Sequence, residues 1–315
     1  MASFDRRDFL KATGVAGVAA LAGCSGSGNG QTRLSWHAGG TGGTYYPLSN
    51  ELKKIIEDNT DYKIQVQSTG ASVENVGSLK SGDADFALIQ NDVAYFAKNG
   101  TGIEAFKGSP VENLRGVATL YPETIHLVTL EETGIESLQD LKGKRVNTGD
   151  LGSGTQVDAL KILNAVGITT DDFTEQNTSF SQASEQLKNG DVDATFTVGG
   201  WPVGAISDLA TTENIRIVPI EGEERQKIKE AASFFADDEI PAGTYDGVDQ
   251  AVPTVSVQAM IATNAEASAD VVENVTAAVF DHTSDLTIKK QFISKESAQD
   301  GMSIELHEGA SAYFG

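Results

Sequence analysis

Short apolar runs rich in β-branched residues alternate with longer amphipathic stretches from about residue 33 to the end of the chain. This alternation is typical of α/β proteins with mostly parallel sheets. The predicted strands are 33–37, 63–67, 85–89, 116–120, 126–130, 144–147, 194–198, 215–219 and 254–262. The predicted helices are 46–59, 73–81, 93–98, 135–140, 156–166, 181–188, 203–211, 223–234 and 268–283. With 315 residues the chain is long enough for two lobes of ordinary domain size.

One short sequence unit occurs once in each half of the chain. Residues 79–86 read LKSGDADF and residues 187–196 read LKNGDVDATF. Each copy combines a helix end, a glycine suited to the left-handed cap, an acidic turn and a buried strand. Either copy alone is common in α/β proteins, but the pair suggests two related lobes.

Three loops rich in glycine and hydroxyl groups each lie between a predicted strand and a predicted helix: residues 39–44, 68–72 and 149–155. In parallel α/β sheets such loops lie at the carboxyl ends of strands, where ligands usually bind. Helix N-termini offer free backbone N–H groups and partial positive charge, so these loops could hold a carboxylate without arginine. For each single loop, ordinary helix capping is an equally good explanation.

Motifs for other chemistry are weak or absent from the sequence. The loop at 149–155 lacks the Gly-Lys-Ser/Thr of a nucleotide-triphosphate loop, and neither it nor residues 39–43 continues into a dinucleotide fingerprint. The four histidines show no close pairing, and no G-x-S-x-G segment is present. No carboxylate pair stands out among the 45 acidic residues. We therefore expect a protein that is not an enzyme, with no cofactor and no metal site.

The charge balance is strongly acidic, with 45 Asp and Glu against 23 Lys and Arg and a formal net charge of −22. Nucleic acid is a poor partner because phosphate backbones require clusters of Lys and Arg. Molar salt screens charge repulsion over a few ångströms, so the composition favours a halophilic source. The alternative is an ordinary acidic extracellular protein.

The first 24 residues have the features of an export signal. Arg6 and Arg7 precede a weakly hydrophobic stretch that ends at Gly23 and is too short to span a membrane. The arginine pair resembles a Tat signal, and residues 21–24 resemble a lipobox. Cys24 is the only cysteine, and residues 25–32 read as a flexible tether. We expect Cys24 to be lipidated and to anchor the exported protein to the outer face of the cytoplasmic membrane, the alternative being a buried thiol.

Several phrases in order along the chain resemble the TAXI family of TRAP-transporter solute receptors. They are GGTGGTYYP at 39–47, STGASVEN at 68–75, ADFALIQNDVA at 84–94, LKGKRV at 141–146, GSGT at 152–155, IPAGTY at 240–245 and LHEGA at 306–310. The resemblance runs from about residue 34 to residue 314. It implies an α/β, two-lobed type II periplasmic-binding-protein fold whose lobes are joined by strands that cross near 121–126 and 254–258. On this basis lobe one is 33–123 plus 258–315, and lobe two is 124–257.

The family resemblance also implies partners and ligands. The partners are the membrane permease subunits of an ion-driven TRAP transporter, and the ligands are glutamate, glutamine and related small carboxylates. The sequence departs from the family pattern at Ala71, where glycine is usual, and at Trp201, where a smaller residue is common. An importer driven by ATP and an extracytoplasmic enzyme on the same scaffold remain alternatives.

From the loops and the resemblance we predict which residues hold the ligand. They are Thr41, Gly43, Thr44, Tyr45, Ser72, Asn75, Gln90, Asp92, Tyr121, Gly152, Ser153, Thr155, Gly200, Trp201 and Tyr245. Gln90 and Asp92 could instead cap the helix that follows them. For the aromatic residues, cation–π contact with a ligand ammonium and simple packing are equal alternatives.

Overall fold

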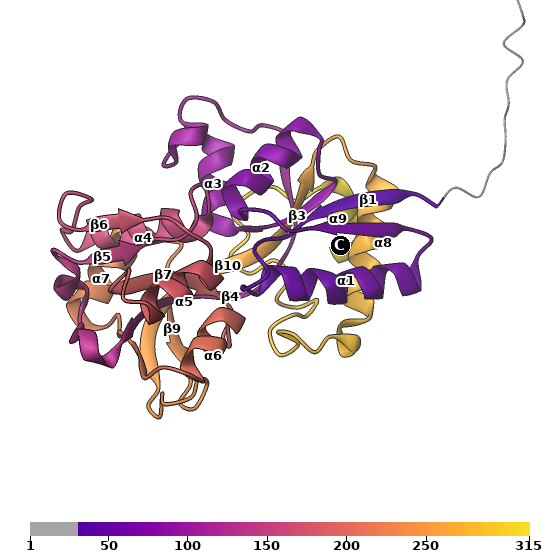
Figure 1. The fold of residues 1–315 in the computed structure, drawn as a ribbon. Coiled ribbons are helices and arrows are strands. Elements are labelled where there is room, and N and C mark those ends of the chain that lie inside the picture. Colours follow the sequence, from indigo (N-terminus) through magenta and orange to yellow (C-terminus); the bar gives the residue numbers. More distant parts are fainter. Residues whose placement is uncertain (1–30) are drawn as a thin grey trace, which may run out of the picture. The chain divides into compact units, whose positions relative to one another are not determined.

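The computed structural model describes residues 31–315, in which ten strands form one mixed sheet (Figure 1). The strands are β1 Arg33–His37, β2 Lys63–Gln67, β3 Phe86–Gln90, β4 Leu114–Leu130, β5 Arg145–Asn147, β6 Thr174–Gln176, β7 Ala194–Gly199, β8 Ile215–Ile217, β9 Ala236–Ile240 and β10 Val252–Asn264. Their order is β2-β1-β3-β10-β4-β7-β5-β6, with β8 paired to β4 and β9 paired to β10.

The helices mostly follow strands in the chain. They are α1 Tyr45–Asn59, α2 Ser72–Ser81, α3 Asn91–Asn99, α4 Gly154–Ala165, α5 Phe180–Lys188, α6 Gly204–Ala210, α7 Gly222–Ala231, α8 Ala269–Asp281 and α9 Glu308–Phe314. Short 3-10 turns occupy Glu104–Phe106, Glu131–Thr133, Leu138–Leu141 and Thr283–Asp285.

Most predicted strands and helices are confirmed to within two residues, and the errors have physical causes. The predicted strands 116–120 and 126–130 are one strand, β4, because the backbone stays extended through Pro122. The predicted helix 135–140 is a 3-10 turn, Leu138–Leu141. The helix predicted to Phe234 ends at Ala231, and β6, β9 and α9 were not predicted. β6 and β9 are polar strands at sheet edges, so they lack the apolar run on which the prediction depended.

Two long strands connect the halves of the sheet. β4 pairs with β10 up to Thr124 and with β7 from Thr124 onward, whereas β10 pairs with β9 up to Ser256 and with β3 from Ala259. Figure 1 shows both strands at the centre of the described part of the chain. The predicted lobe limits, 33–123 with 258–315 and 124–257, are consistent with these changes of partner and stay a proposal.

Each half of the sheet is covered by helices on both faces. In lobe one, α1 and α8 pack on one face and α2 and α3 on the other, so side chains of β3 alternate between the two cores. In lobe two, α4 and α7 cover one face and α5 and α6 the other. This arrangement explains why the central strands are apolar on both sides. The architecture is the predicted two-lobed α/β fold.

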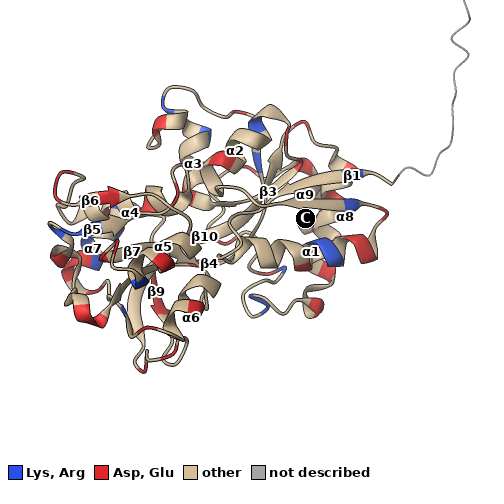
Figure 2. Ribbon diagram, in the orientation of Figure 1, with Lys and Arg blue, Asp and Glu red and all other residues tan. Residues whose placement is uncertain are grey.

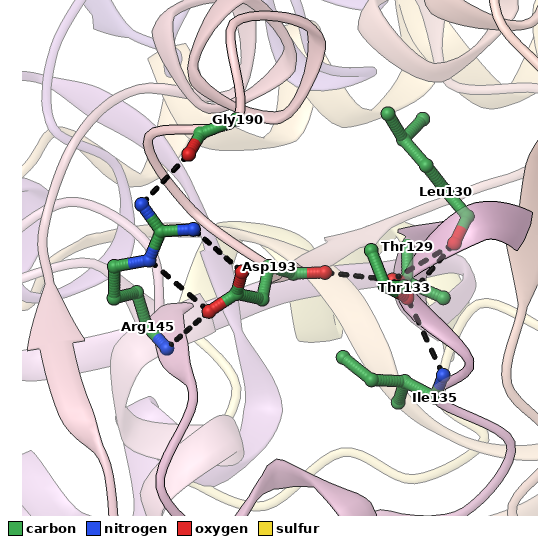
Figure 3. A network of polar contacts seen from close by, with 7 residues as sticks. All are labelled: Thr129, Leu130, Thr133, Ile135, Arg145, Gly190 and Asp193. Carbon is green, nitrogen blue, oxygen red and sulfur yellow. Dashed lines mark hydrogen bonds and ion pairs between the residues drawn. The ribbon is translucent and has the colours of Figure 1, made fainter.

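The repeated sequence unit has the same structure in both lobes. Gly82 and Gly190 both adopt a left-handed conformation, with φ of 80° and 69°. Asp85 accepts a hydrogen bond from the backbone N–H of Ser35 at 2.7 Å, and Asp193 accepts one from that of Arg145 at 2.8 Å. In the second copy, the Arg145 guanidinium adds an ion pair to Asp193 at 2.6 Å (Figure 3). Each unit thus fastens the start of a buried strand to its neighbour.

Acidic side chains outnumber basic ones on the helices and loops of both lobes (Figure 2). Among residues 31–315, no helix combines the length and apolar character needed to cross a bilayer. The predicted signal peptide at 1–24, the lipidation site Cys24 and nearly all of the tether at 25–32 lie outside the described residues.

Candidate functional site

A cavity of about 150 Å³ lies between the two lobes, where loops follow the carboxyl ends of β1, β2, β3, β5 and β6. A cavity of this size in another protein binds a molecule the size of benzene, so the site suits a small ligand. The lining residues are Gly39, Gly40, Thr41, Gly42, Gly43, Thr44, Tyr45, Thr69, Gly70, Ala71, Ser72, Gln90, Glu123, Asp150, Ser153, Gly154, Thr155, Ser179, Phe180, Ser181 and Val198.

The N-termini of α1, α2, α4 and α5 all meet at this cavity, two from each lobe. The first backbone N–H groups of a helix have no partner within the helix, and the helix dipole adds partial positive charge. No Lys or Arg lines the cavity. The walls can therefore bind an anionic group through backbone amides and hydroxyl groups alone.

Asn75 holds the two loops of lobe one in place. Its side-chain amide donates to the carbonyl oxygens of Ala38 at 2.7 Å and Leu88 at 2.8 Å, and its oxygen accepts from Thr69 Oγ1 at 2.7 Å. Because these bonds satisfy the whole amide and Asn75 is fully buried, this residue positions the loops from behind the cavity wall.

The lobes are closed over the cavity and joined by a few polar contacts. Thr44 Oγ1 donates to the carbonyl oxygen of Gly200 at 3.0 Å, and Ala205 N donates to Gly42 O at 3.1 Å. Lys289 of lobe one donates from Nζ to the carbonyl oxygen of Trp201 in lobe two. Its Nζ also lies 5.3 Å from the Trp201 ring centroid.

Three positions on this closed interface leave no room for any residue larger than glycine. A Cβ atom at Gly154 would overlap Oε1 of Gln90 in the opposite lobe, and one at Gly42 would lie 2.5 Å from Ser181 Oγ. A Cβ atom at Gly200 would collide with the Lys289 side chain. The lobes can approach this closely only because these positions lack side chains.

The cavity floor carries a carboxyl group with no basic partner within ion-pair distance among the described residues. Glu123 lies on β4 where the strand passes between lobes, and its side chain is nearly buried. Burial raises the pKa of Glu123 to about 8, while the nearby phenols of Tyr121 and Tyr45 and the charge of Lys289 act against that rise. The hydroxyl groups of Tyr45 and Tyr121 are buried and have no hydrogen-bond partner in the described structure.

A pair of carboxyl groups lies where the lobes meet, behind the cavity. Asp92 on α3 and Asp158 on α4 are fully buried side by side, and Gln90 Nε2 donates to Asp158 Oδ2 at 3.0 Å. Burial raises the pKa of Asp92 to about 6, and burial followed by the charge of Asp92 raises the pKa of Asp158 well above its usual range. Because two adjacent carboxylates repel each other, the closed state favours a proton shared between them.

The structure brings together about half of the predicted ligand residues. Those lining the cavity are Thr41, Gly43, Thr44, Tyr45, Ser72, Gln90, Ser153 and Thr155. Those outside the lining are Asn75, Asp92, Tyr121, Gly152, Gly200, Trp201 and Tyr245. Tyr245 is turned away, because its hydroxyl group bonds His126 Nε2 at 2.9 Å and Val203 N at 2.9 Å.

The alternative of simple capping fits only one loop. Ser153 caps α4 by accepting from Gln156 N at 3.1 Å. Thr44 and Gln90 make no cap bond, and both instead contact the opposite lobe. Trp201 packs against Lys289 and Phe292 at the interface between lobes, which is a packing role.

Sequence reasoning missed two parts of the site. Ser179, Phe180 and Ser181 follow β6, whose polar sequence hid the strand, although Ser179 and Gln182 form a capping box that marks the helix start. Glu123 is the other omission. It is the single acidic residue between 116 and 130, a segment otherwise suited to a buried strand, and this isolation was a usable signal.

Within residues 31–315 no cluster of three or more His, Cys, Asp or Glu side chains is placed to hold a metal ion. The buried His126 is engaged by Tyr245 and by the Thr124 carbonyl oxygen at 3.0 Å, and burial lowers its pKa to about 4. It is therefore a neutral structural histidine.

Solved structures show which class of protein has this fold. The alkanesulfonate-binding protein from Xanthomonas axonopodis pv. citri bound to MOPS is 15% identical, with a TM-score of 0.50, 90% of this chain covered and 83% of that one. PhnD1 from Prochlorococcus marinus in complex with methylphosphonate is 11% identical, with a TM-score of 0.55 and coverage of 83% and 89%. An ancestral arginine-binding protein bound to arginine is 16% identical, with a TM-score of 0.50 and coverage of 82% and 96%. The fold is that of the periplasmic solute-binding proteins.

Sequence comparison gives the family. Residues 37–315 match the NMT1-like family, and residues 3–23 match the signal sequence of the twin-arginine translocation pathway. The chain therefore belongs to the NMT1-like family and begins with a Tat signal sequence, as the arginine pair predicted.

Proposed function

We propose that this protein is an extracytoplasmic solute receptor of a TRAP transporter of the TAXI type, which captures a small carboxylate or amino acid such as glutamate or glutamine. The observation that carries the proposal is the meeting of four helix N-termini, two from each lobe, around a small closed cavity without Lys or Arg. A ligand bound to both lobes stabilises the closed state by its differential affinity for that state, and the permease recognises that state.

Capture without chemistry is the simplest use of this site. Backbone amides and hydroxyl groups bind a carboxylate well, whereas the cavity lining contains no histidine, cysteine or lysine to act as nucleophile or base. The acidic residues Glu123 and Asp150 remain in the lining. Mass spectrometry of ligand incubated with pure protein distinguishes the roles, since a receptor returns the ligand unchanged.

The first experiment is a thermal-shift screen of amino acids and small carboxylates at molar salt. A ligand of the native state raises the unfolding temperature by mass action, and calorimetry then gives its Kd. The protein with its permease in vesicles should take up that ligand under an ion gradient without ATP. Uptake that requires ATP instead would assign the receptor to an ATP-driven importer, whose receptors share this fold.

We further propose that the exported protein is lipidated at Cys24 and held at the outer face of the cytoplasmic membrane. Three sequence features support this proposal: the arginine pair, the lipobox-like segment and the single cysteine. Mass spectrometry of the mature chain, compared with a Cys24→Ser variant, should show a lipid on the wild-type protein only. We also propose that the protein comes from a halophilic source. An unfolding temperature that rises with salt concentration would support this proposal.

A further inference from the structure

Hydrogen-bond donors and acceptors both line the cavity. The free N–H groups of four helix N-termini and several hydroxyl groups supply donors. The carboxyl groups of Glu123 and Asp150 are acceptors. A ligand that uses both kinds of group needs an anionic group at one end and a donor group at the other.

Two polar atoms beside the cavity have no partner in the protein but are not open to a ligand. Gln90 Oε1 and Tyr45 Oη make no hydrogen bond among the described residues, and both atoms are fully buried. Gln90 Oε1 lies against Gly154, where a Cβ atom would overlap it, and the Tyr45 phenol lies next to Glu123. The carboxyl groups in the cavity lining are therefore those of Glu123 and Asp150.

Glu123 is the more deeply buried of these two carboxyl groups and has no basic partner within ion-pair distance among the described residues. The nearest basic side chain, Lys289, makes its hydrogen bond to the Trp201 carbonyl oxygen and lies over the rings of Trp201 and Tyr121, at 5.3 and 5.9 Å from their centroids. Lys289 forms no ion pair with Glu123 among the described residues. The carboxyl group on the floor thus faces the cavity without a fixed counter-ion.

We propose that Glu123 is the specificity-determining residue of this site, and that it binds a primary ammonium group of the ligand. This inference rests on the proposed function and narrows it: the ligand is a small zwitterion, with its carboxylate at the helix N-termini and its ammonium on Glu123. A buried carboxyl group in the lining without a fixed counter-ion is well suited to accept from an ammonium group.

Binding should also release a proton. Because burial raises the pKa of Glu123 to about 8, most of this carboxyl is protonated in the empty site at pH 7. A bound ammonium favours the carboxylate, so the carboxyl proton leaves to solvent while the ligand keeps all its own protons. The net release at pH 7 approaches about one proton per ligand.

The test uses matched sets of an α-amino acid with its α-hydroxy and α-keto analogues, measured by calorimetry on the mature protein at high salt. Wild-type protein should bind the amino member of one set and reject its analogues, since only the amino member carries a cation. Glu123→Gln should weaken that binding about 10- to 100-fold and abolish the proton release seen in buffers of different ionisation enthalpy. Glu131→Gln, an exposed site at the end of the same strand, is the matched control and should change neither quantity.

Two other results are informative. If a keto or hydroxy analogue binds as tightly as the amino acid, or Glu123→Gln keeps full affinity and proton release, the role of Glu123 is wrong while the receptor function stands. If no member of any set binds, the proposed function fails together with this inference. Should Glu123→Gln not fold, Glu123→Asp keeps the carboxyl group but shortens its side chain, and an undiminished preference for the amino acid in that variant would contradict the role of Glu123.

Discussion

Contacts inside each lobe and contacts between the lobes are built in different ways. Within a lobe, the repeated unit is fully bonded: Asp85 and Asp193 each accept from the neighbouring strand, and their carbonyl oxygens accept from Thr263 at 2.7 Å and Thr129 at 2.6 Å. Figure 3 shows this network in lobe two.

Between the lobes, aromatic contacts such as Phe96 with Phe234 lie beside polar atoms that have no partner among the described residues. Gln90 binds Asp158, but both oxygens of Asp92 and one of Asp158 have no donor among the described residues. Charge shows the same contrast, because Arg145 holds the pKa of Asp193 below its usual range, whereas burial raises the pKa of Asp92 and Glu123. The difference teaches that polar groups are paired inside each lobe, whereas the stability of the junction depends on the protonation of its carboxyl groups.

The largest effect on the junction should come from Gly154→Ala. The added Cβ overlaps the buried Gln90 side chain of the other lobe, so closure becomes unfavourable while the helix itself accepts alanine. We expect ligand affinity to fall about 10- to 100-fold. Calorimetry measures this change, and small-angle scattering shows whether the lobes stay apart.

The matched control is Gly77→Ala in α2, where a Cβ meets no atom within 4 Å. This variant should keep its affinity and gain slight stability from better helix propensity. Equal affinities for the Gly77 and Gly154 variants would mean that the closed contact is not part of binding.

A substitution inside a lobe should lower the unfolding temperature and leave the ligand affinity nearly unchanged. Asp193→Ala leaves the backbone N–H of Arg145 without its acceptor and removes the guanidinium pair, so the unfolding temperature should drop by roughly 3–8 °C. Asp85→Ala, which removes only bonds to Ser35, should cost less. Ligand affinity below the unfolding range should stay within about twofold. A large loss of affinity in either folded variant would contradict this expectation.

The pH should change the stability of the junction through the protonation of Asp92 and Asp158. Both have pKa values above those of an unfolded chain, so the folded state holds more protons and its stability falls as the pH rises above about 4. For Asp92 this loss continues through about pH 6. Glu123 extends this loss toward pH 8. Asp158→Asn can donate to Asp92 and still accept from Gln90, so it should be more stable than wild type at pH 8 and lose that advantage near pH 4. Urea unfolding at several pH values checks this, and a stability difference that does not vary with pH would contradict it.

The smallest expected effect is that of Thr44→Val. The substitution keeps the shape of the side chain but leaves the carbonyl oxygen of Gly200 without its donor in the closed state, at a cost of about 1 kcal/mol. That cost corresponds to about a fivefold weaker affinity. Titration calorimetry with the same ligand measures it, and a loss of a hundredfold would show that Thr44 contacts the ligand directly.

The amino-acid sequence alone determined most of the local structure and the type of site. Alternating strand and helix patterns, Gly82 and Gly190 in the repeated units, and the three glycine-rich loops are local signals, since turn geometry and helix starts depend on neighbouring residues. From these signals, together with the family resemblance, the two-lobed α/β fold and eight of the residues lining the cavity were predicted.

Only the tertiary structure decided the rest, because it depends on contacts between residues far apart in the chain. The closed interface brought Gln90 to Asp158 and Lys289 to Trp201, and it turned Asn75 and Tyr245 away from the cavity. Glu123 became notable only when β4 placed it beneath the loops of both lobes. The residue type determines which hydrogen bonds a side chain can make, but its burial and its partners in the fold determine whether it is available to a ligand.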